Sequence, residues 1–347
     1  MKKSIKLVSI VLALVLMLAL ALVFVACNKN SSEQETPVAP RDDTVIKIDD
    51  IKGKTVACIG NGAVPGLTFT YVVKNNGLEI ITEGTPNENQ VKVIWAADGA
   101  AANAAIVNGS ADFAVVGEPA ATALSAKFGY TRSMNIQDEY AKVNANNGST
   151  YPQAGIFVKT SLAENEGFMT ALFEALAASK KWVTENKADV TKYMQDNLYE
   201  SAAFPPASID RCAINAKRAD AGEQARIIAF LSNIMQNVNW SANSAKLFVS
   251  TMATSALADG TSLRFAAPEG TPALTIGRLA TDNLTLYGAS MEYDVVAPIN
   301  IATEMAAGKA DIVIMPINAG ANLIVNKNAD YKLVSVAVDG SLFMIGK

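Results

Sequence analysis

Histidine is absent from this sequence, and cysteine is scarce, with 3 residues in 347. Without histidine the chain lacks Ser-His-Asp and Cys-His catalytic arrangements, histidine acid–base catalysis and the usual zinc sites. The cysteines include no Cys-x-x-Cys pair, which excludes an iron–sulfur cluster and a disulfide framework. We therefore expect a binding protein rather than an enzyme, with no catalytic residue, no metal site and no cofactor.

Charge is also limited. Charged residues make up 18% of the chain, the formal net charge is −4, and the pI is near 5.1. Nucleic-acid phosphates bind to basic surfaces, so this composition argues against a nucleic-acid partner. Half of the residues are apolar, and the length is typical of two domains with cores of their own.

Residues 1–26 have the layout of a secretory signal. An apolar run extends from Leu7 to Ala26, after three lysines at the start of the chain, Lys2, Lys3 and Lys6. A run of about 20 apolar residues is long enough to cross a bilayer, so an uncleaved membrane anchor is the alternative. A polar stretch rich in Ser, Glu, Asn and Pro follows, and it predicts a flexible tether over residues 27–43.

The end of the apolar run separates these two alternatives. Phe24-Val25-Ala26-Cys27 resembles the lipobox of bacterial lipoproteins, although Phe24 stands where leucine is commoner. The resemblance implies cleavage before Cys27, lipidation of its thiol by acyl chains such as palmitate, and a location outside the cytoplasm on the cell membrane.

Two stretches of the remaining chain have the same pattern. The first opens with a short apolar strand and a Gly/Pro loop over Lys54–Pro65, followed by a helix over Leu67–Asn75. The second opens in the same way over Leu263–Pro272, followed by a helix over Ala273–Thr281. Each continues with a further strand, helix and strand, and the last strand follows Asp112 in one unit and Asp311 in the other. We interpret both aspartates as structural. Apolar strands alternating with helices predict an α/β fold with parallel sheets.

The repeat predicts two lobes with a ligand cleft at the carboxyl ends of their strands. We expect the first α/β lobe over residues 44–155. The second, over residues 156–347, includes a helical region from Leu162 to Tyr199.

The loop motifs of the two units carry a resemblance to a known family. They are Gly117-Glu118-Pro119-Ala120, Gly270-Thr271-Pro272-Ala273 and Pro316-Ile317-Asn318-Ala319. Together with the lipobox, they resemble the solute-binding proteins of ABC importers, in the type II periplasmic-binding group of nitrate, sulfonate, taurine and thiamine-precursor binders. The resemblance implies a monomeric, lipid-anchored component that captures a small anionic or planar heteroaromatic solute by lobe closure and delivers it to permease and ATPase subunits.

The order of the two units is the reverse of that family's order. In the family the unit at Arg264-Phe265-Ala266 comes first, and the unit at Asp50-Ile51-Lys52 second. The sequence therefore resembles a circular permutation, with a mis-assembled gene as the alternative. A permutation predicts that Lys347 lies near Thr44 and that a single covalent connection, around residues 154–159, joins the lobes.

Candidate ligand-binding residues are those at helix starts facing the cleft, where backbone N–H groups favour an anion or another hydrogen-bond acceptor. Glycine turns, helix caps and core packing are the alternative interpretations. We expect Trp95 to stack on a planar ligand, or else to pack in the core. We expect Glu118 to accept a hydrogen bond from an N–H group or cation. The full set is Asn61, Gly62, Ala63, Trp95, Asp98, Glu118, Gly270, Thr271, Pro272, Ala297, Asn318 and Ala319.

Two other functions remain open at this point. A ligand-sensing module that reports to a membrane receptor would have the same sequence features as an importer component. An exported enzyme of the same fold is the third possibility, and the missing histidine argues against it.

Overall fold

The structure is a computed structural model that describes residues 44–144 and 150–347. The predicted signal sequence, Cys27 and the tether lie outside the described residues. Within the described ranges, no helix has the length and apolarity needed to cross a membrane.

The first sheet has six strands in the order β2-β3-β1-β4-β12-β5. β1, β2, β3 and β4 are parallel to their neighbours, whereas β12 is antiparallel to both β4 and β5. The strands are β1 (Thr55–Ile59), β2 (Glu79–Ile81), β3 (Gln90–Ala96), β4 (Phe113–Gly117), β5 (Arg132–Asn135) and β12 (Leu342–Gly346).

The second sheet repeats this arrangement. Its order is β8-β9-β7-β10-β6-β11, and β6 is antiparallel to both of its neighbours, as β12 is in the first sheet. The expected α/β class with two lobes is confirmed, but the sheets are mixed rather than parallel. One strand of each enters from the other lobe and is antiparallel to its neighbours, and β8 is antiparallel to β9 in the second sheet. The strands are β6 (Pro152–Lys159), β7 (Ser262–Pro268), β8 (Thr285–Leu286), β9 (Ala289–Val296), β10 (Ile312–Pro316) and β11 (Tyr331–Asp339).

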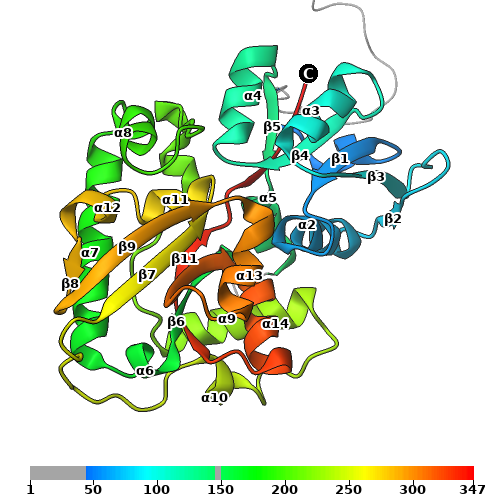
Figure 1. Cartoon of the computed structure of the whole chain (residues 1–347). Coiled ribbons are helices and arrows are strands. Elements are labelled where there is room, and N and C mark those ends of the chain that lie inside the picture. The colour runs from blue at the N-terminus through cyan, green and yellow to red at the C-terminus, as the bar shows by residue number, and fades with distance from the viewer. Residues whose placement is uncertain (1–43, 145–149) are drawn as a thin grey trace, which may run out of the picture. The chain divides into compact units, whose positions relative to one another are not determined.

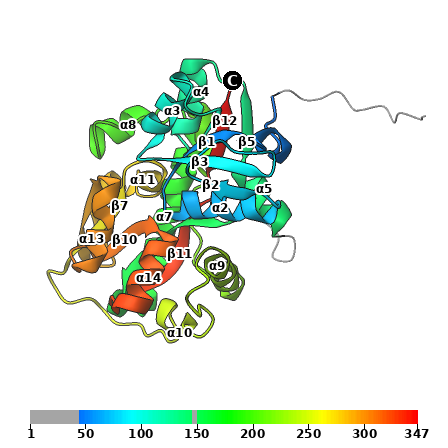
Figure 2. The same cartoon turned by 90° about the vertical axis from the view of Figure 1, so that its right-hand side faces the viewer.

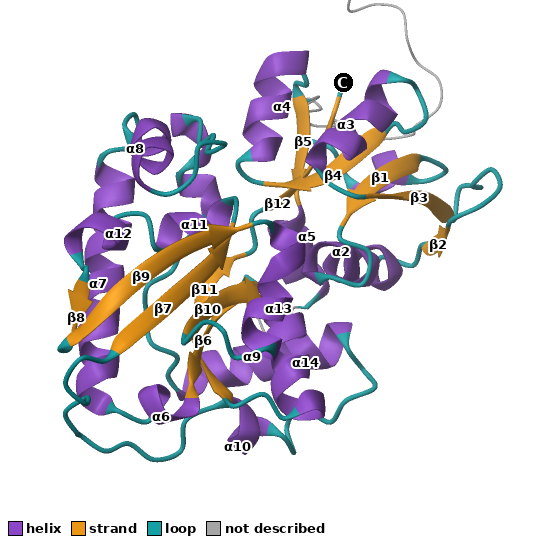
Figure 3. Cartoon of the chain, viewed as in Figure 1, coloured by secondary structure: helices purple, strands orange, loops and turns teal. Residues whose placement is uncertain are grey.

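Helices flank the strands of both sheets (Figures 1 and 3). Those from the first part of the chain are η1 (Ile48–Ile51), α2 (Val64–Asn75), α3 (Gly99–Val107), α4 (Ala120–Phe128) and α5 (Ile136–Val143). Those in the middle are α6 (Thr160–Ala163), α7 (Glu166–Glu185), α8 (Val190–Asn197), η2 (Pro206–Ser208), η3 (Asp210–Cys212), α9 (Ala221–Ile234) and α10 (Ser244–Leu247). The remainder are α11 (Thr271–Thr275), α12 (Leu279–Asp282), η4 (Pro298–Asn300), α13 (Ile301–Ala306) and α14 (Ile317–Lys327).

The helix expected over residues 273–281 is interrupted. α11 ends at Thr275 and α12 begins at Leu279, with Gly277 between them. A Cβ atom on Gly277 would lie 3.1 Å from the sulfur of Met194, so the glycine permits close packing against α8. Glycine is also a poor helix former, which accounts for the break.

Two aspartates show that the repeat extends to hydrogen bonding. Asp112 Oδ2 accepts a hydrogen bond from the Thr55 N–H at 2.9 Å, and Asp311 Oδ2 accepts one from the Arg264 N–H at 2.8 Å. In each case the aspartate before one strand binds the backbone at the start of the neighbouring strand. The structural interpretation of Asp112 and Asp311 therefore agrees with their contacts.

The chain passes between the sheets twice, not once as expected. It leaves the first sheet after α5 to form β6, and it returns after β11 to form β12. The expected lobe boundary between residues 155 and 156 therefore does not coincide with the division between the sheets. β6 of the second sheet already begins at Pro152, and β12 belongs to the first sheet although its residues fall within 156–347. Because β12 pairs with β4 and β5 in this way, the single-connection expectation is wrong.

The two ends of the described chain lie close together. The Thr44 carbonyl accepts a hydrogen bond from the Ser133 N–H at 2.9 Å, and Ser133 pairs with Ile345 on its other side. Val45 and Ile345 thus flank β5, so two strand spacings of about 5 Å each separate them. Figure 2 shows the C-terminus at the end of β12, next to β5. The expected proximity of the chain ends is confirmed.

The two connections between the sheets touch each other. The Gly340 N–H donates to the Tyr151 carbonyl at 2.9 Å, and the Ser341 N–H donates to Gln153 Oε1 at 3.0 Å. Arg226 of α9 joins both connections, with Nη1 2.7 Å from the Thr150 carbonyl and Nη2 2.7 Å from Asp339. The connecting segments therefore form one hydrogen-bonded unit, which we call the paired crossing.

Candidate functional site

A cavity of about 680 Å³ lies between residues of the two sheets. On the first side it is lined by the ends of β1 and β4 and the starts of α3 and α4, and on the second by residues 269–272 and several residues between Tyr199 and Phe204. Its volume falls within the range of small-molecule sites. We refer to it as the cleft.

Glu118, at the end of β4, is the most enclosed charged group of the cleft. Its side chain is fully buried and forms an ion pair with Arg211 Nε at 2.7 Å. Its oxygens also accept hydrogen bonds from the Thr122 N–H at 3.0 Å and the Thr122 hydroxyl at 2.9 Å. Burial raises the pKa of Glu118, while Arg211 and the Thr122 hydrogen bonds act in the opposite direction.

The backbone of Glu118 connects three parts of the chain. The Thr271 hydroxyl, at the start of α11, donates to the Glu118 carbonyl at 2.7 Å. The Glu118 N–H donates to the Ser341 carbonyl in the paired crossing at 2.9 Å. These contacts hold the ends of β4 and β7 together at the cleft.

Arg211 comes from η3, a segment with no counterpart in the other repeat. Its guanidinium lies 3.9 Å from the ring centroid of Phe343 in β12, in a cation–π contact. Arg211 therefore contacts Glu118 and Phe343 of the first sheet, although it follows the long helices of the second part.

The second side of the cleft is built around a glycine turn. Gly270 has φ of +88°, a conformation that favours glycine, and its N–H points to the Tyr199 hydroxyl at 3.3 Å. Burial raises the pKa of Tyr199 to about 12, and the nearby charge of Glu269 acts in the same direction. The phenol is therefore neutral at physiological pH.

Asp98 lies across from this turn, at the start of α3. Its Oδ1 accepts a hydrogen bond from the Ala101 N–H at 2.8 Å, so Asp98 is the N-cap of the helix. The helix-cap interpretation of Asp98 and its place in the cleft both hold, because an exposed cap carboxylate faces the cavity.

The structure brings five of the predicted site residues together around the cleft: Asp98, Glu118, Gly270, Thr271 and Pro272. Ala297 directly precedes Pro298, which lines the cleft. The remaining six do not line it: Asn61, Gly62, Ala63, Trp95, Asn318 and Ala319.

Those six residues lie where α2 and α14 begin. Asn318 Nδ2 donates to the Gly62 carbonyl at 3.2 Å, so this pair links the two lobes directly. Trp95 packs against the start of α2, where a Cβ atom on Gly66 would lie 2.8 Å from its ring. Trp95 is partly buried and packs against the core, in agreement with the packing alternative.

Sequence reasoning missed most of the cleft wall after α8. Tyr199, Ser201 and Phe204 lie in a segment outside the repeat, so no internal pattern marked them. Glu269 could have been predicted from the sequence, because it is a charged residue inside the Gly/Pro loop from which Gly270, Thr271 and Pro272 were selected as candidate ligand-binding residues.

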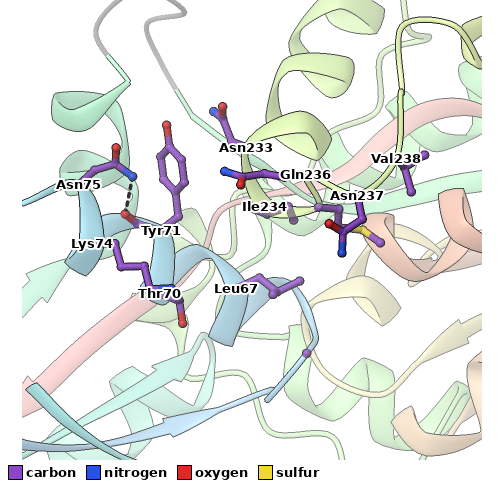
Figure 4. Close-up of a pocket in the computed structure, with 12 residues that line it drawn as sticks. Leu67, Thr70, Tyr71, Lys74, Asn75, Asn233, Ile234, Gln236, Asn237 and Val238 are labelled. Carbon is purple, nitrogen blue, oxygen red and sulfur yellow. Dashed lines mark hydrogen bonds between the residues drawn. The ribbon is translucent and has the colours of Figure 1, made fainter. Parts of the chain in front are cut away.

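A second hollow, of about 610 Å³, lies along α2 (Figure 4). The Tyr71 ring stands between Asn75 on one side and Asn233 on the other. Asn75 Nδ2 donates to the Tyr71 carbonyl at 2.8 Å, while Asn233 Nδ2 donates to Tyr140 at 3.1 Å. Its rim residues Lys74 and Gln236 are exposed.

The described cysteines, Cys58 and Cys212, are buried free thiols, as expected. Burial raises the pKa of Cys212 to about 12, so its thiol is protonated and unreactive at neutral pH. Within residues 44–144 and 150–347, no cluster of three or more His, Cys, Asp or Glu side chains has the geometry of a metal site.

Comparisons with known proteins give structural similarity without sequence similarity. No family model and no curated protein matches the chain. Solved structures that are similar include a phosphate-binding protein of a phosphate ABC transporter from Streptococcus pneumoniae (TM-score 0.31, 10% identity, 84% of this chain and 88% of that one). Immunogenic lipoprotein A from Vibrio vulnificus is similar too (TM-score 0.34, 10% identity, 84% and 86%). A third is the alkanesulfonate-binding protein SsuA from Xanthomonas axonopodis bound to MOPS (TM-score 0.30, 11% identity, 85% and 65%). TM-scores of this size do not establish a shared ligand.

Proposed function

We propose that this protein captures a small solute in the cleft by closing its two lobes around it. The observation that carries the proposal is a cavity of about 680 Å³ whose walls come from the strand ends of both sheets. Ligands of open α/β sheets bind at such ends. The contacts Thr271–Glu118 and Asn318–Gly62 join the two sides, as contacts of a closed state would.

The size and lining of the cleft support a compact organic solute. Of the two ligand classes expected from the sequence, anionic and planar heteroaromatic, the half-buried ring of Tyr199 supports the second. Asp98, Glu118, Gly270, Thr271 and Pro272 are the proposed ligand-binding residues among those selected from the sequence.

We propose further that the protein is a lipid-anchored, extracytoplasmic component of an ABC importer and that it works as a monomer. The lipobox at Cys27 supports the anchor, and the permuted repeat supports the family. Delivery to permease and ATPase subunits follows from that family. The adjacent chain ends, Thr44 and Lys347, support a circular permutation rather than a mis-assembled gene. A receptor-linked sensor is the alternative, and an exported enzyme is a weaker one.

Solution scattering with a thermal-shift screen tests solute capture. A solute that binds only the folded protein raises its melting temperature, and lobe closure reduces the radius of gyration. Nitrate, sulfonates, pyrimidines, flavins and amino acids make up the first screen. A saturating ligand that leaves the scattering profile unchanged would contradict lobe closure.

The lipid anchor has a separate test. Cys27→Ser should prevent processing and lipidation, since acyl transfer requires the thiol. Ser4→Ala, in the same signal, is the control and should be processed normally. Processing of the Cys27→Ser protein to its mature size would contradict the lipoprotein assignment.

A further inference from the structure

We propose that the solute captured in the cleft carries a positive charge on an apolar or aromatic body, and that Asp98 and Glu269 bind this charge from opposite walls. The inference rests on the proposed function, since it concerns the ligand of the same cavity. The inference goes beyond the proposed function by naming the sign of the ligand charge.

The cleft has an excess of negative charge. Three carboxylates line it, those of Asp98, Glu118 and Glu269, and no lysine or arginine of the described residues does. Arg211 reaches the Glu118 carboxylate from beside the cavity and neutralises it. Neither Asp98 nor Glu269 has a cationic side chain within ion-pair distance in the described part of the chain.

These two carboxylates belong to different lobes. Asp98 precedes α3 of the first sheet, and Glu269 follows β7 of the second. Both side chains are exposed and line one cavity, so lobe closure brings their like charges together. A cation between them replaces this repulsion with two attractions, so its binding favours the closed state.

Three N–H groups at the cleft are already occupied by the chain itself. Those of Ala101 and Thr122, at the starts of α3 and α4, donate to Asp98 and Glu118. The Gly270 N–H donates to the Tyr199 hydroxyl. An anion in the cleft would face the carboxylates of Asp98 and Glu269, which argues against the anionic solute class expected from the sequence.

The rest of the lining suits an apolar or aromatic body. Ile59, Leu124, Pro272 and Pro298 supply apolar surface from both lobes, and Tyr199 supplies a half-buried ring. An aromatic face beside carboxylates also suits an organic cation, through cation–π attraction. The chain itself shows this combination next to the cleft, where Arg211 pairs with Glu118 and lies over Phe343.

The test compares probes that share a body and differ in charge. Phenethylamine, phenylacetamide and phenylacetate form one set, and tryptamine, indole-3-acetamide and indole-3-acetate form another. Binding to the full-length protein in detergent is measured by calorimetry for the wild type and the double variant Asp98→Asn/Glu269→Gln. Asparagine retains the helix cap at residue 98. Glu83→Gln/Asp259→Asn is the control, with the same charge change on exposed loops.

We expect the amine of at least one set to bind at least tenfold more tightly than its amide and its acid. The double variant should lose about tenfold in affinity or more, as expected for removal of charged hydrogen-bond partners. The control variant should bind the amine as the wild type does. Amine binding that is unchanged in the double variant would overturn the inference.

A measurement without any ligand completes the test. If Asp98 and Glu269 repel each other, the double variant should have a smaller radius of gyration than the wild type at low salt, and high salt should remove the difference by screening. Equal profiles, together with no binding of either amine, would overturn the inference. Contraction with a neutral or anionic solute would also overturn it, yet would leave solute capture by lobe closure standing.

Discussion

Arg226 offers the sharpest test of how the two lobes are joined. Its side chain is 18% exposed and ion-pairs with Glu223 and Asp339, while Nη1 donates to the Thr150 carbonyl. Thr150 and Asp339 belong to the two strands of the paired crossing. We call these contacts of Arg226 with Thr150 and Asp339 the clamp. Arg226→Met keeps much of the side-chain volume and removes all of these hydrogen bonds, so it separates the effect of the clamp on stability from the effect of packing.

The size of the effect follows from what the substitution leaves behind. Removing one partner of a buried ion pair costs about 3–5 kcal/mol, because the remaining charge is left without compensation. Asp339 is 21% exposed, so solvent screens part of this and we expect about 3 kcal/mol. For a body of about 300 residues the melting temperature should fall by about 5 °C. Lys192→Met is the control, since its pair with Asp196 is exposed and is worth at most about 0.5 kcal/mol.

Urea unfolding followed by circular dichroism measures both variants. Adding Asp339→Asn to Arg226→Met should restore part of the lost stability, because the uncompensated carboxylate is then removed. A loss no larger than that of Lys192→Met, or a double variant less stable than the sum of both single changes, would refute the clamp.

Two further predictions concern the crossing and the cleft. Gly340→Ala places a Cβ atom 1.6 Å from Gln137 Oε1 and 2.5 Å from the Tyr151 ring, and this overpacking should cost about 1–3 kcal/mol in urea unfolding. Gly222→Ala, whose nearest atom is 3.3 Å away, should change stability little, and equal losses would contradict the packing argument. Burial raises the pKa of Glu118 above its ordinary 4.5, so the folded state binds the carboxyl proton more tightly than the unfolded state does. The contribution of Glu118 to the free energy of unfolding should therefore fall as pH rises above 4.5. Unfolding titrations of Glu118→Gln should lack this slope, and a slope equal to that of the wild type would refute the assignment.

The repeat made much of the fold predictable. Residues before each strand, such as Asp112 and Asp311, occur in equivalent places and make equivalent hydrogen bonds, so local pattern and final structure agree. The boundaries of β3, α3 and β4 also follow directly from apolar periodicity and from the caps at Asp98 and Gly109.

The strand exchange was not predictable in the same way. The apolar runs of β6 and β12 indicate buried strands, but nothing in their periodicity tells which sheet accepts them. That choice is made by pairing over long sequence separation, as between Ile345 and Ser133. A single crossing was therefore a reasonable inference from residue order, and long-range pairing overrode it.

The residues of the candidate site likewise divide into those that the repeat predicts and those that it does not. Residues at repeat positions, such as Asp98 and Thr271, were found because helix starts at strand ends face the cleft. Tyr199 and Phe204 were missed as cleft residues, and Arg211 as the partner of Glu118, because they lie in the segment without a repeat partner. That segment has no counterpart in the other half of the repeat, so the part of the cleft wall that it forms does not follow from the repeat.

The contacts around Glu118 bear on the proposed lobe closure. Its carbonyl accepts the Thr271 hydroxyl, its N–H binds Ser341 of the paired crossing, and its carboxylate holds Arg211. The Thr271 and Arg211 contacts join the first lobe to other parts of the chain, so in the proposed mechanism they would stabilise the closed state before any ligand is present. The affinity of a solute would then scale with the fraction of molecules that are closed, and these contacts would set part of that affinity without touching the solute. Because Arg211 comes from outside the repeat, substitutions in its segment would change the closed fraction and leave the two sheets unchanged.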